Sequence, residues 1–246
     1  MIVHVKTRCK QPDLGGKGII GAIPWLEIPC NFPEGSFQPY DVQDRINHFE
    51  SYKNPRLFKM HVRWNKIEPF CSKAKVITIT RDPRDLPYSW FNHMSIMKGI
   101  EIPPWEIFVE DWIDKMSLIP WMKSFWPHRN DENVLWLRYE DLKLDMEGTA
   151  RKILDFTGWE CTDEELQTAI ELSSFSHMQK NERKHFIHED RTIFRPGSNF
   201  IRDGKVGSNR QKLTEGMTER IMEKLRKELP EDAVEWLVSD PNDHHN

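Results

Sequence analysis

The chain of 246 residues is 38% hydrophobic and 30% charged, so it can bury the core of one large α/β domain or of two small ones. Its net charge of -4 argues against a nucleic-acid binder held by overall positive charge, although a local basic pocket is compatible with that total. No apolar run reaches membrane-spanning length, and the four cysteines are far apart without a CxxC pair, which favours a reduced, cytoplasmic protein with neither a zinc site nor a disulfide framework.

The N-terminal quarter of the chain carries weak signals. Residues 1–8 are typical of the last turns of a helix, and the glycine-rich run at residues 15–18 is typical of a flexible connector. That run lacks the GxxxxGK[ST] spacing of a phosphate loop, and no predicted strand precedes it. A strand is then predicted over residues 56–61, RLFKMH, from a weak alternation of apolar and polar residues.

The stretch AKVITITRDPRDLPYSWFN, residues 74–92, predicts a strand, a tight turn and a helix. Residues 76–80 are β-branched throughout, as in a short buried strand. The turn follows at Pro83, because proline fixes φ and disfavours helix in the residue before it. Asp85 is then the predicted helix cap, with Pro87 tolerated in the first helical turn.

The same stretch has the features of a phosphate site. The N-terminus of the predicted helix offers N–H groups and partial positive charge, Arg81 offers a bidentate fork, and Ser89 offers a hydroxyl. The alternative is an ordinary surface turn in which Arg81 pairs with Asp82 or Asp85. The local pattern leaves both interpretations open.

The rest of the chain alternates helical patterns with one further strand. Helices are predicted over residues 105–116, 146–156, 162–172 and 214–229, and a strand over residues 133–139. The apolar stripe of the first of these helices, which we expect to face the core, consists of Ile107, Phe108, Trp112 and Ile113. Residues 173–210 lose this periodicity, as long binding loops do, and residues 237–246 are expected to fray. Strands that alternate with helices predict an α/β fold, a parallel sheet flanked by helices in one domain over residues 1–246.

Five segments, in this order, resemble the cytosolic sulfotransferases, which move a sulfuryl group from 3′-phosphoadenylyl sulfate (PAPS) to an acceptor hydroxyl or amine. They are RLFKMH (56–61), ITRDPRDLPYS (79–89), VLWLRYEDL (134–142), LSSFSHMQKN (172–181) and FIRDGKVG (200–207). The resemblance runs from about residue 1 to residue 229. It implies the P-loop nucleotide-kinase-like fold of that family and PAPS as cosubstrate, with no metal.

The resemblance also implies roles for ten residues. His61 matches the catalytic general base and Lys59 a helper that stabilises charge, although a histidine after a strand is often structural and a lysine there often solvated. The positions that match cofactor-binding residues are Arg81, Ser89, Arg202 and Gly204 at the 3′-phosphate, and Tyr139, Ser173, Phe175 and Met178 near the adenine.

The resemblance implies a small-molecule acceptor but does not identify it. Trp25, Trp64, Phe91 and Trp105 could line an apolar pocket for a phenol, an alcohol, a steroid-like molecule or an amine, or could equally be core. PWLE, residues 24–27, resembles a segment near the acceptor. The sequence does not decide whether the chain forms a homodimer, because QKLTEGMTERI is a poor match to the family's dimer motif.

Three departures from the family pattern bear on activity. The family's opening strand and YPKSGTTW-like loop, which grip the 5′-phosphosulfate, have no counterpart, so we expect an N-terminally truncated member. Asp203 replaces a basic residue, and Ser208-Asn209 follow Gly207 where a tryptophan is usual. The competing hypotheses are a non-catalytic protein that binds PAP or another nucleotide, such as an inactive truncated paralogue, and, with less support, a P-loop kinase.

Overall fold

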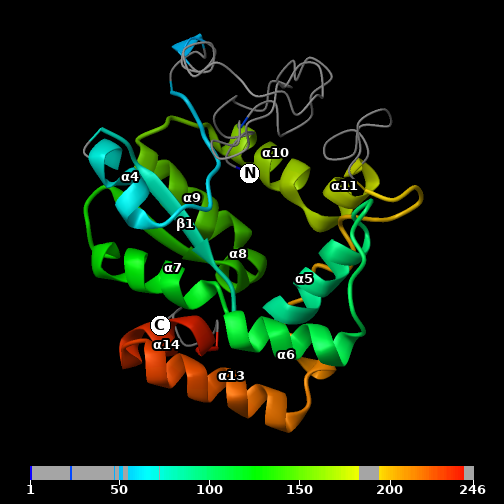
Figure 1. Cartoon of the computed structure of the whole chain (residues 1–246). Coiled ribbons are helices and arrows are strands. Elements are labelled where there is room, and N and C mark those ends of the chain that lie inside the picture. The colour runs from blue at the N-terminus through cyan, green and yellow to red at the C-terminus, as the bar shows by residue number, and fades with distance from the viewer. Residues whose placement is uncertain are drawn as a thin grey trace. The chain divides into compact units, whose positions relative to one another are not determined.

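The computed structural model describes residues 55–71, 73–182 and 194–240, together with Met1, Ile23, Asn47, Glu50 and Ser51 (Figure 1). The chain divides into two compact units. The first unit comprises Met1–Val62, Cys161–Phe194 and Asn199–Ile201, and the second unit comprises Arg63–Glu160, Arg195–Ser198 and Arg202–Asn246. None of the helices in these described ranges is long and apolar enough to cross a membrane.

The second unit contains a parallel pair of strands. β1 (Val76–Thr80) pairs with β2 (Val134–Arg138), with Val76 opposite Val134 and Thr80 opposite Arg138. The β-branched run predicted this strand correctly, and the predicted parallel sheet flanked by helices is confirmed. Because the two strands end in register, the residues that follow them, Arg81 and Tyr139, emerge at the same edge of the sheet.

Three helices connect the strands, and four more follow in the described part of the second unit. The connecting helices are α5 (Leu86–Ser95), α6 (Trp105–Lys115) and α7 (Leu118–Phe125), followed by a 3-10 turn (Trp126–His128). The later helices are α8 (Tyr139–Leu144), α9 (Met146–Thr157), α13 (Glu215–Glu228) and α14 (Glu231–Val238), with a 3-10 turn (Arg210–Lys212) before α13. Gly158 ends α9 in the left-handed region at φ 72°, as its sequence position predicts.

The core of the second unit lies among α6, α7, α13 and α14, which pack together in Figure 1. Its buried members are Val109, Ile113, Met116, Ile119, Met122, Trp126, Ile221, Leu225, Leu229, Ala233, Val234 and Leu237. The predicted stripe on α6 is only partly right. Ile113 is buried, whereas the Ile107 side chain is 60% exposed, because the buried face passes through Val109 instead.

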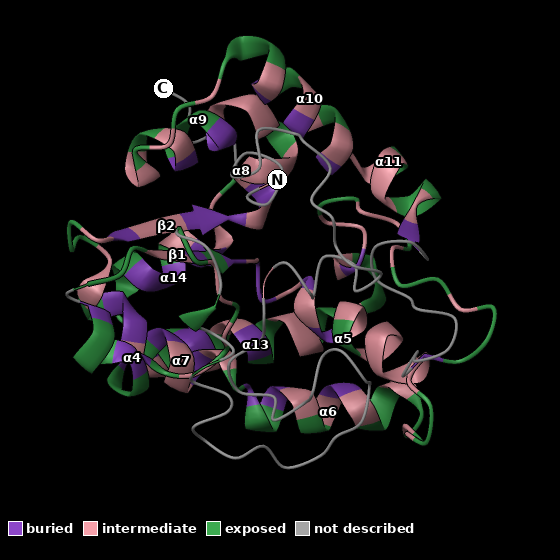
Figure 2. Cartoon of the chain, turned by 90° about the horizontal axis from the view of Figure 1, so that it is seen from above, coloured by how far each residue is buried: buried purple, intermediate pink, exposed green. Residues whose placement is uncertain are grey.

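The sequence patterns missed α4 (Trp64–Cys71), α7 and α14, each of which contains or follows a proline. A proline in the first turn costs no hydrogen bond, so Pro120 fits the start of α7, and Pro230 both ends α13 and precedes α14. α4 carries Pro69 yet buries Trp64, Ile67 and Cys71 on one face. Figure 2 shows this helix as partly buried and partly exposed. α14 includes the first two residues of the predicted tail, and residues 241–246 lie outside the described ones.

The first unit contains α10 (Asp163–Ser173) and α11 (Phe175–Lys180). The predicted capping box is confirmed: the Thr162 hydroxyl accepts the Glu165 N–H at 3.2 Å, and the Glu165 carboxylate accepts the Thr162 N–H at 2.9 Å. α11 lies inside the stretch expected to be mostly irregular. Ser174 caps it by accepting the His177 N–H at 3.2 Å. This capping serine is a local helix signal, but the polar composition of the stretch led us to expect a loop.

The strand predicted over residues 56–61 was wrong. Only Lys59 forms an isolated β-bridge, and no continuous strand is present there. Leu57 and Phe58 are both half-buried, so half-buried and exposed side chains alternate only from Phe58 to His61.

Candidate functional site

Three predicted site residues of the second unit come together at the edge of the sheet. Arg81 follows β1, Ser89 lies in the first turns of α5, and Tyr139 opens α8 directly after β2. Arg81 Nη1 lies 3.4 Å from Ser89 Oγ, and its guanidinium carbon lies 4.6 Å from the centre of the Tyr139 ring. The predicted strand over residues 133–139 was one residue too long at each end, because β2 begins at Val134 and Tyr139 already belongs to the helix.

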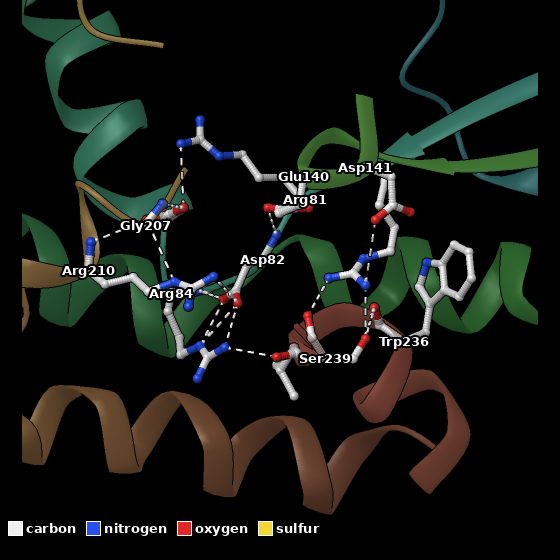
Figure 3. Close-up of polar contacts among 12 residues, drawn as sticks. Arg81, Asp82, Arg84, Glu140, Asp141, Gly207, Arg210, Trp236 and Ser239 are labelled. Atoms are coloured by element: carbon white, nitrogen blue, oxygen red, sulfur yellow. Dashed lines mark hydrogen bonds and ion pairs between the residues drawn. The ribbon is translucent and has the colours of Figure 1, made fainter. Parts of the chain in front are cut away.

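Asp82, the residue after Arg81, is a buried ionic anchor of the turn. Its carboxylate accepts Arg84 Nε at 2.9 Å and Arg84 Nη2 at 2.6 Å, and it also pairs with Arg210 Nη2 at 2.8 Å (Figure 3). Asp82 is fully buried, so two arginines balance a charge that water does not reach. Arg84 in turn donates to the Val238 carbonyl at 3.0 Å, which attaches the end of α14 to the turn.

Asp85 does not cap α5 as predicted. Its carboxylate is fully buried and turns toward a loop more than 120 residues later, where it accepts the Gly207 N–H at 2.8 Å and the Arg210 N–H at 3.2 Å. The Gly207 N–H therefore binds an internal carboxylate. The surface-turn alternative holds only in part, since Arg81 Nη2 lies 3.7 Å from a carboxylate that is not at the surface.

Arg202 and Gly204 lie in the same loop. Arg202 Nη2 donates to Asn209 Oδ1 at 3.0 Å, and the Arg202 guanidinium lies 5.4 Å from the centre of the Tyr88 ring. Gly204 has φ 63°, a left-handed conformation that suits glycine. Lys212 Nζ also approaches Tyr88, at 5.6 Å, so the loop brings two cations to the ring.

Glu140 accepts a backbone hydrogen bond from the turn that follows β1. It is 1% exposed, and its Oε1 accepts the Asp82 N–H at 3.0 Å, whereas its Oε2 has no hydrogen-bond partner in the part of the chain that the structure describes. Burial raises the pKa of the Glu140 carboxyl above its ordinary value, and the same cause raises the pKa of the Tyr139 phenol.

The predicted catalytic pair and the remaining adenine-side residues belong to the first unit. Lys59 and His61 are exposed. Ser173 ends α10, and its hydroxyl donates to the Ala169 carbonyl at 2.6 Å. Phe175 opens α11 and Met178 lies within it, both half-buried.

The aromatic residues considered for an acceptor pocket divide between two environments. Trp64 is core, stacked on His128 at 4.0 Å and edge-on to Phe125 at 5.4 Å. Phe91 and Trp105 belong to a cluster in which α5 packs against α6, with ring centres 5.4 Å apart. Trp25 lies outside the described residues.

The second-unit arrangement can bind an anion beside an aromatic ring. Asp82 binds Arg84 and Arg210 closely, whereas Arg81 approaches Asp85 through Nη2 only at ion-pair distance, 3.7 Å, and donates through Nη1 to Ser89 at 3.4 Å. Arg81 therefore retains donors for an oxyanion. Within the described residues, no group of three or more His, Cys, Asp or Glu side chains is arranged to hold a metal ion.

The sequence named Arg81, Ser89 and Tyr139 as candidates, and the structure brings them together, but the long-range contacts around them were not predicted. Asp85, Glu140 and Asn209 are all buried and hydrogen-bonded; Asp85 carried a local signal only as a helix cap, and Glu140 and Asn209 carried none. The alternation of acids and arginines in RDPRD was the one available hint, because charges so dense must find partners when they are buried.

Comparison with known proteins identifies the class. The family model described as the sulfotransferase domain matches residues 2–232, so the chain belongs to the sulfotransferase family. Sulfotransferase 2A6 of Rattus norvegicus is 30% identical over 174 residues, which are 68% of this chain and 61% of that protein. The amine sulfotransferase of Oryctolagus cuniculus is 26% identical over 229 residues, 87% of this chain and 73% of its own length.

Solved structures share the fold. Retinol dehydratase, solved with androsterone and the inactive cofactor PAP, superposes with a TM-score of 0.71 at 21% identity, covering 92% of this chain and 75% of that one. Mouse sulfotransferase SULT7A1, solved with PAP, gives a TM-score of 0.69 at 22% identity, covering 96% and 81% of the two chains.

Proposed function

We propose that this chain transfers a sulfuryl group from PAPS to a hydroxyl or amine of a small-molecule acceptor, and that residues 1–246 form one sulfotransferase domain. The convergence of Arg81, Ser89 and Tyr139 at the end of two parallel strands is the observation that carries the proposal. The family match, which extends over both units, supports it.

Arg81 and Ser89 would hold the 3′-phosphate of the nucleotide, with Arg202 and Gly204 as further contacts. The guanidinium supplies charged donors and the serine a hydroxyl, and Arg81 already lies close to both Ser89 and the Tyr139 ring. Tyr139 would contact the adenine, together with Ser173, Phe175 and Met178. The contacts of Arg81, Ser89 and Arg202 with the 3′-phosphate would distinguish PAPS from a nucleotide without that group.

His61 would accept the proton of the acceptor hydroxyl or amine. A histidine suits this task near neutral pH because its ordinary pKa is about 6.5. Lys59 would stabilise negative charge during transfer. PAPS supplies the sulfuryl group, and the chain's contribution is to place it in line with the acceptor.

Relatives and structural neighbours suggest the class of acceptor. Their names include an amine sulfotransferase and a 3-alpha-hydroxysteroid sulfotransferase, and retinol dehydratase was solved with retinol as well as with androsterone. We propose a phenol, a steroid-like or other alcohol, or an amine as the acceptor of this chain.

Binding and transfer test the proposal together. Titration calorimetry should show PAP binding that weakens about 10- to 100-fold in Arg81→Ala, because a hydrogen bond to a charged group is worth about 1.5–3 kcal/mol. Arg151→Ala, which removes an exposed arginine paired with Glu147 on α9, is the matched control and should leave PAP affinity unchanged.

Radiolabelled PAPS should transfer its label to a phenol, a steroid alcohol or a primary amine, and His61→Ala should abolish transfer while PAP still binds. Binding of PAP without transfer to any of the three acceptors would instead identify a non-catalytic nucleotide-binding protein. Phosphorylation of an acceptor by ATP would favour a kinase.

A further inference from the structure

We propose that Asp85 is a positioning residue: it fixes where Arg81 and Arg202 lie relative to each other and thereby determines selectivity for the 3′-phosphate. The inference rests on the proposed function, because it takes Arg81 and Arg202 to bind the 3′-phosphate of the nucleotide. All the residues concerned belong to the second unit. Figure 3 shows part of the network, from Arg81 and Asp82 to Gly207 and Arg210.

The carboxylate of Asp85 holds the loop by its backbone. Oδ2 accepts the Gly207 N–H at 2.8 Å, and Oδ1 accepts the Arg210 N–H at 3.2 Å, so both oxygens are engaged by one short segment. Gly207 has φ 77°, a conformation that side chains disfavour, which aims its N–H into the buried site. With its side chain fully buried, Asp85 has no water to replace these donors.

The backbone of Asp85 holds Arg202 through Asn209. The Asp85 carbonyl accepts Asn209 Nδ2 at 3.2 Å, and Asn209 Oδ1 accepts Arg202 Nη2 at 3.0 Å. Asn209 is 5% exposed, so the amide is fixed between a carbonyl and a guanidinium. One residue of the turn therefore fixes both the path of the loop and the direction of its arginine.

Asp85 also leaves Arg81 available to a ligand. Because its two oxygens accept backbone N–H groups, it lies 3.7 Å from Arg81 Nη2, near enough to orient the guanidinium and too far for a hydrogen bond. Arg210 Nη2 pairs with Asp82 at 2.8 Å, and Arg210 Nε lies 3.9 Å from Asp85 Oδ1. Asp85 thus holds Arg202 indirectly, through Asn209, and lies close to Arg81 without a hydrogen bond to it.

A positioning role makes a prediction that a purely structural role does not. AMP and PAP differ only by the 3′-phosphate, so the ratio of their dissociation constants reports this subsite alone. Asp85→Asn keeps the size of the side chain but places an amide against two N–H donors, which displaces the loop. We expect the AMP-to-PAP ratio to fall at least tenfold in Asp85→Asn, with AMP affinity within about twofold of wild type.

The full chain is used throughout, and calorimetry with PAP and AMP is paired with circular dichroism and thermal melting. Asp111→Asn, the same change at an exposed α6 residue paired with Lys115, should leave the ratio unchanged. Asn209→Ala removes only the bridge to Arg202 and should also lower the ratio. In an Arg202→Ala background, Asp85→Asn should cost less than in wild type, since the two act through one contact.

A folded Asp85→Asn protein with an unchanged ratio would overturn the proposal. If that variant does not fold, Asn209→Ala decides: a lower ratio supports the proposal and an unchanged ratio overturns it. A wild-type chain that does not prefer PAP to AMP overturns the proposed function, and this inference with it. Failure of the inference alone shows instead as a wild-type preference for PAP that Asp85→Asn leaves unchanged.

Discussion

Asp82 and Asp85 are two buried carboxylates next to a site that we propose to bind a phosphate. The groups that contact these carboxylates compensate their negative charge. Asp82 is balanced by Arg84 and Arg210, and Asp85 accepts backbone N–H groups. Removing one partner of such a buried pair typically costs about 3–5 kcal/mol, because the remaining charge is left without water. The acids thus stabilise the turn while Arg81 keeps its donors.

Glu140 gives a pH-dependent test at the scale of one residue. Burial raises its folded pKa above the ordinary value of 4.5, so its contribution to stability is full below that value and falls as pH rises through the folded pKa. Glu140→Gln keeps the acceptor for the Asp82 N–H but cannot ionise. The free energy of unfolding of the variant minus that of wild type should therefore increase as pH rises from below 4.5.

Urea unfolding at a series of pH values measures this difference, and Glu132→Gln, an exposed residue before β2, is the control. A difference that stayed constant from acid to neutral pH would show that Glu140 is not the group that loses stability on ionisation.

At the scale of the element, local capping decides where several helices begin and end. Thr162 and Glu165 form a complete capping box at α10, Thr214 caps α13 by accepting the Met217 N–H at 3.2 Å, and Gly158 ends α9. All of these interactions join residues three or four positions apart, so they are visible in the sequence.

Thr162→Ala should lower the free energy of unfolding by about 1 kcal/mol, the usual cost of losing a threonine cap, because an N–H at the start of α10 loses its acceptor. Thr168→Ala is a matched control in the same helix, where the exposed hydroxyl donates to the Glu164 carbonyl within the helix. Equal melting temperatures for Thr162→Ala and Thr168→Ala would contradict the capping role.

At the scale of the whole molecule, tertiary packing selects which apolar positions are buried. Ile107 and Ile113 share α6, but only Ile113 reaches the core formed with α7, α13 and α14. Ile113→Ala should cost about 2–5 kcal/mol of unfolding free energy through lost burial and a cavity. Ile107→Ala, 60% exposed in the native chain, should stay within about 0.5 kcal/mol of wild type.

Chemical denaturation of both isoleucine variants provides the comparison. A large loss at Ile107 with little change at Ile113 would mean that α6 presents its opposite face to the core.

The sequence by itself determined the features whose causes are local or lie in ordered motifs. The β-branched run specified β1, the capping box and Gly158 specified helix ends, and the two predicted parallel strands placed Arg81 and Tyr139 at one edge of the sheet. These succeeded because the interacting atoms are close along the chain, or because parallel strands necessarily end at one edge.

Only the tertiary structure decided what Asp85 does. At the start of α5 it had a local role available, as a cap, yet its carboxylate binds N–H groups more than 120 residues away. The prolines before α14 and inside α4 and α7 likewise acquired their meaning from the faces those helices bury. A buried charge takes the partners that folding brings to it, and sequence separation does not reveal which those are.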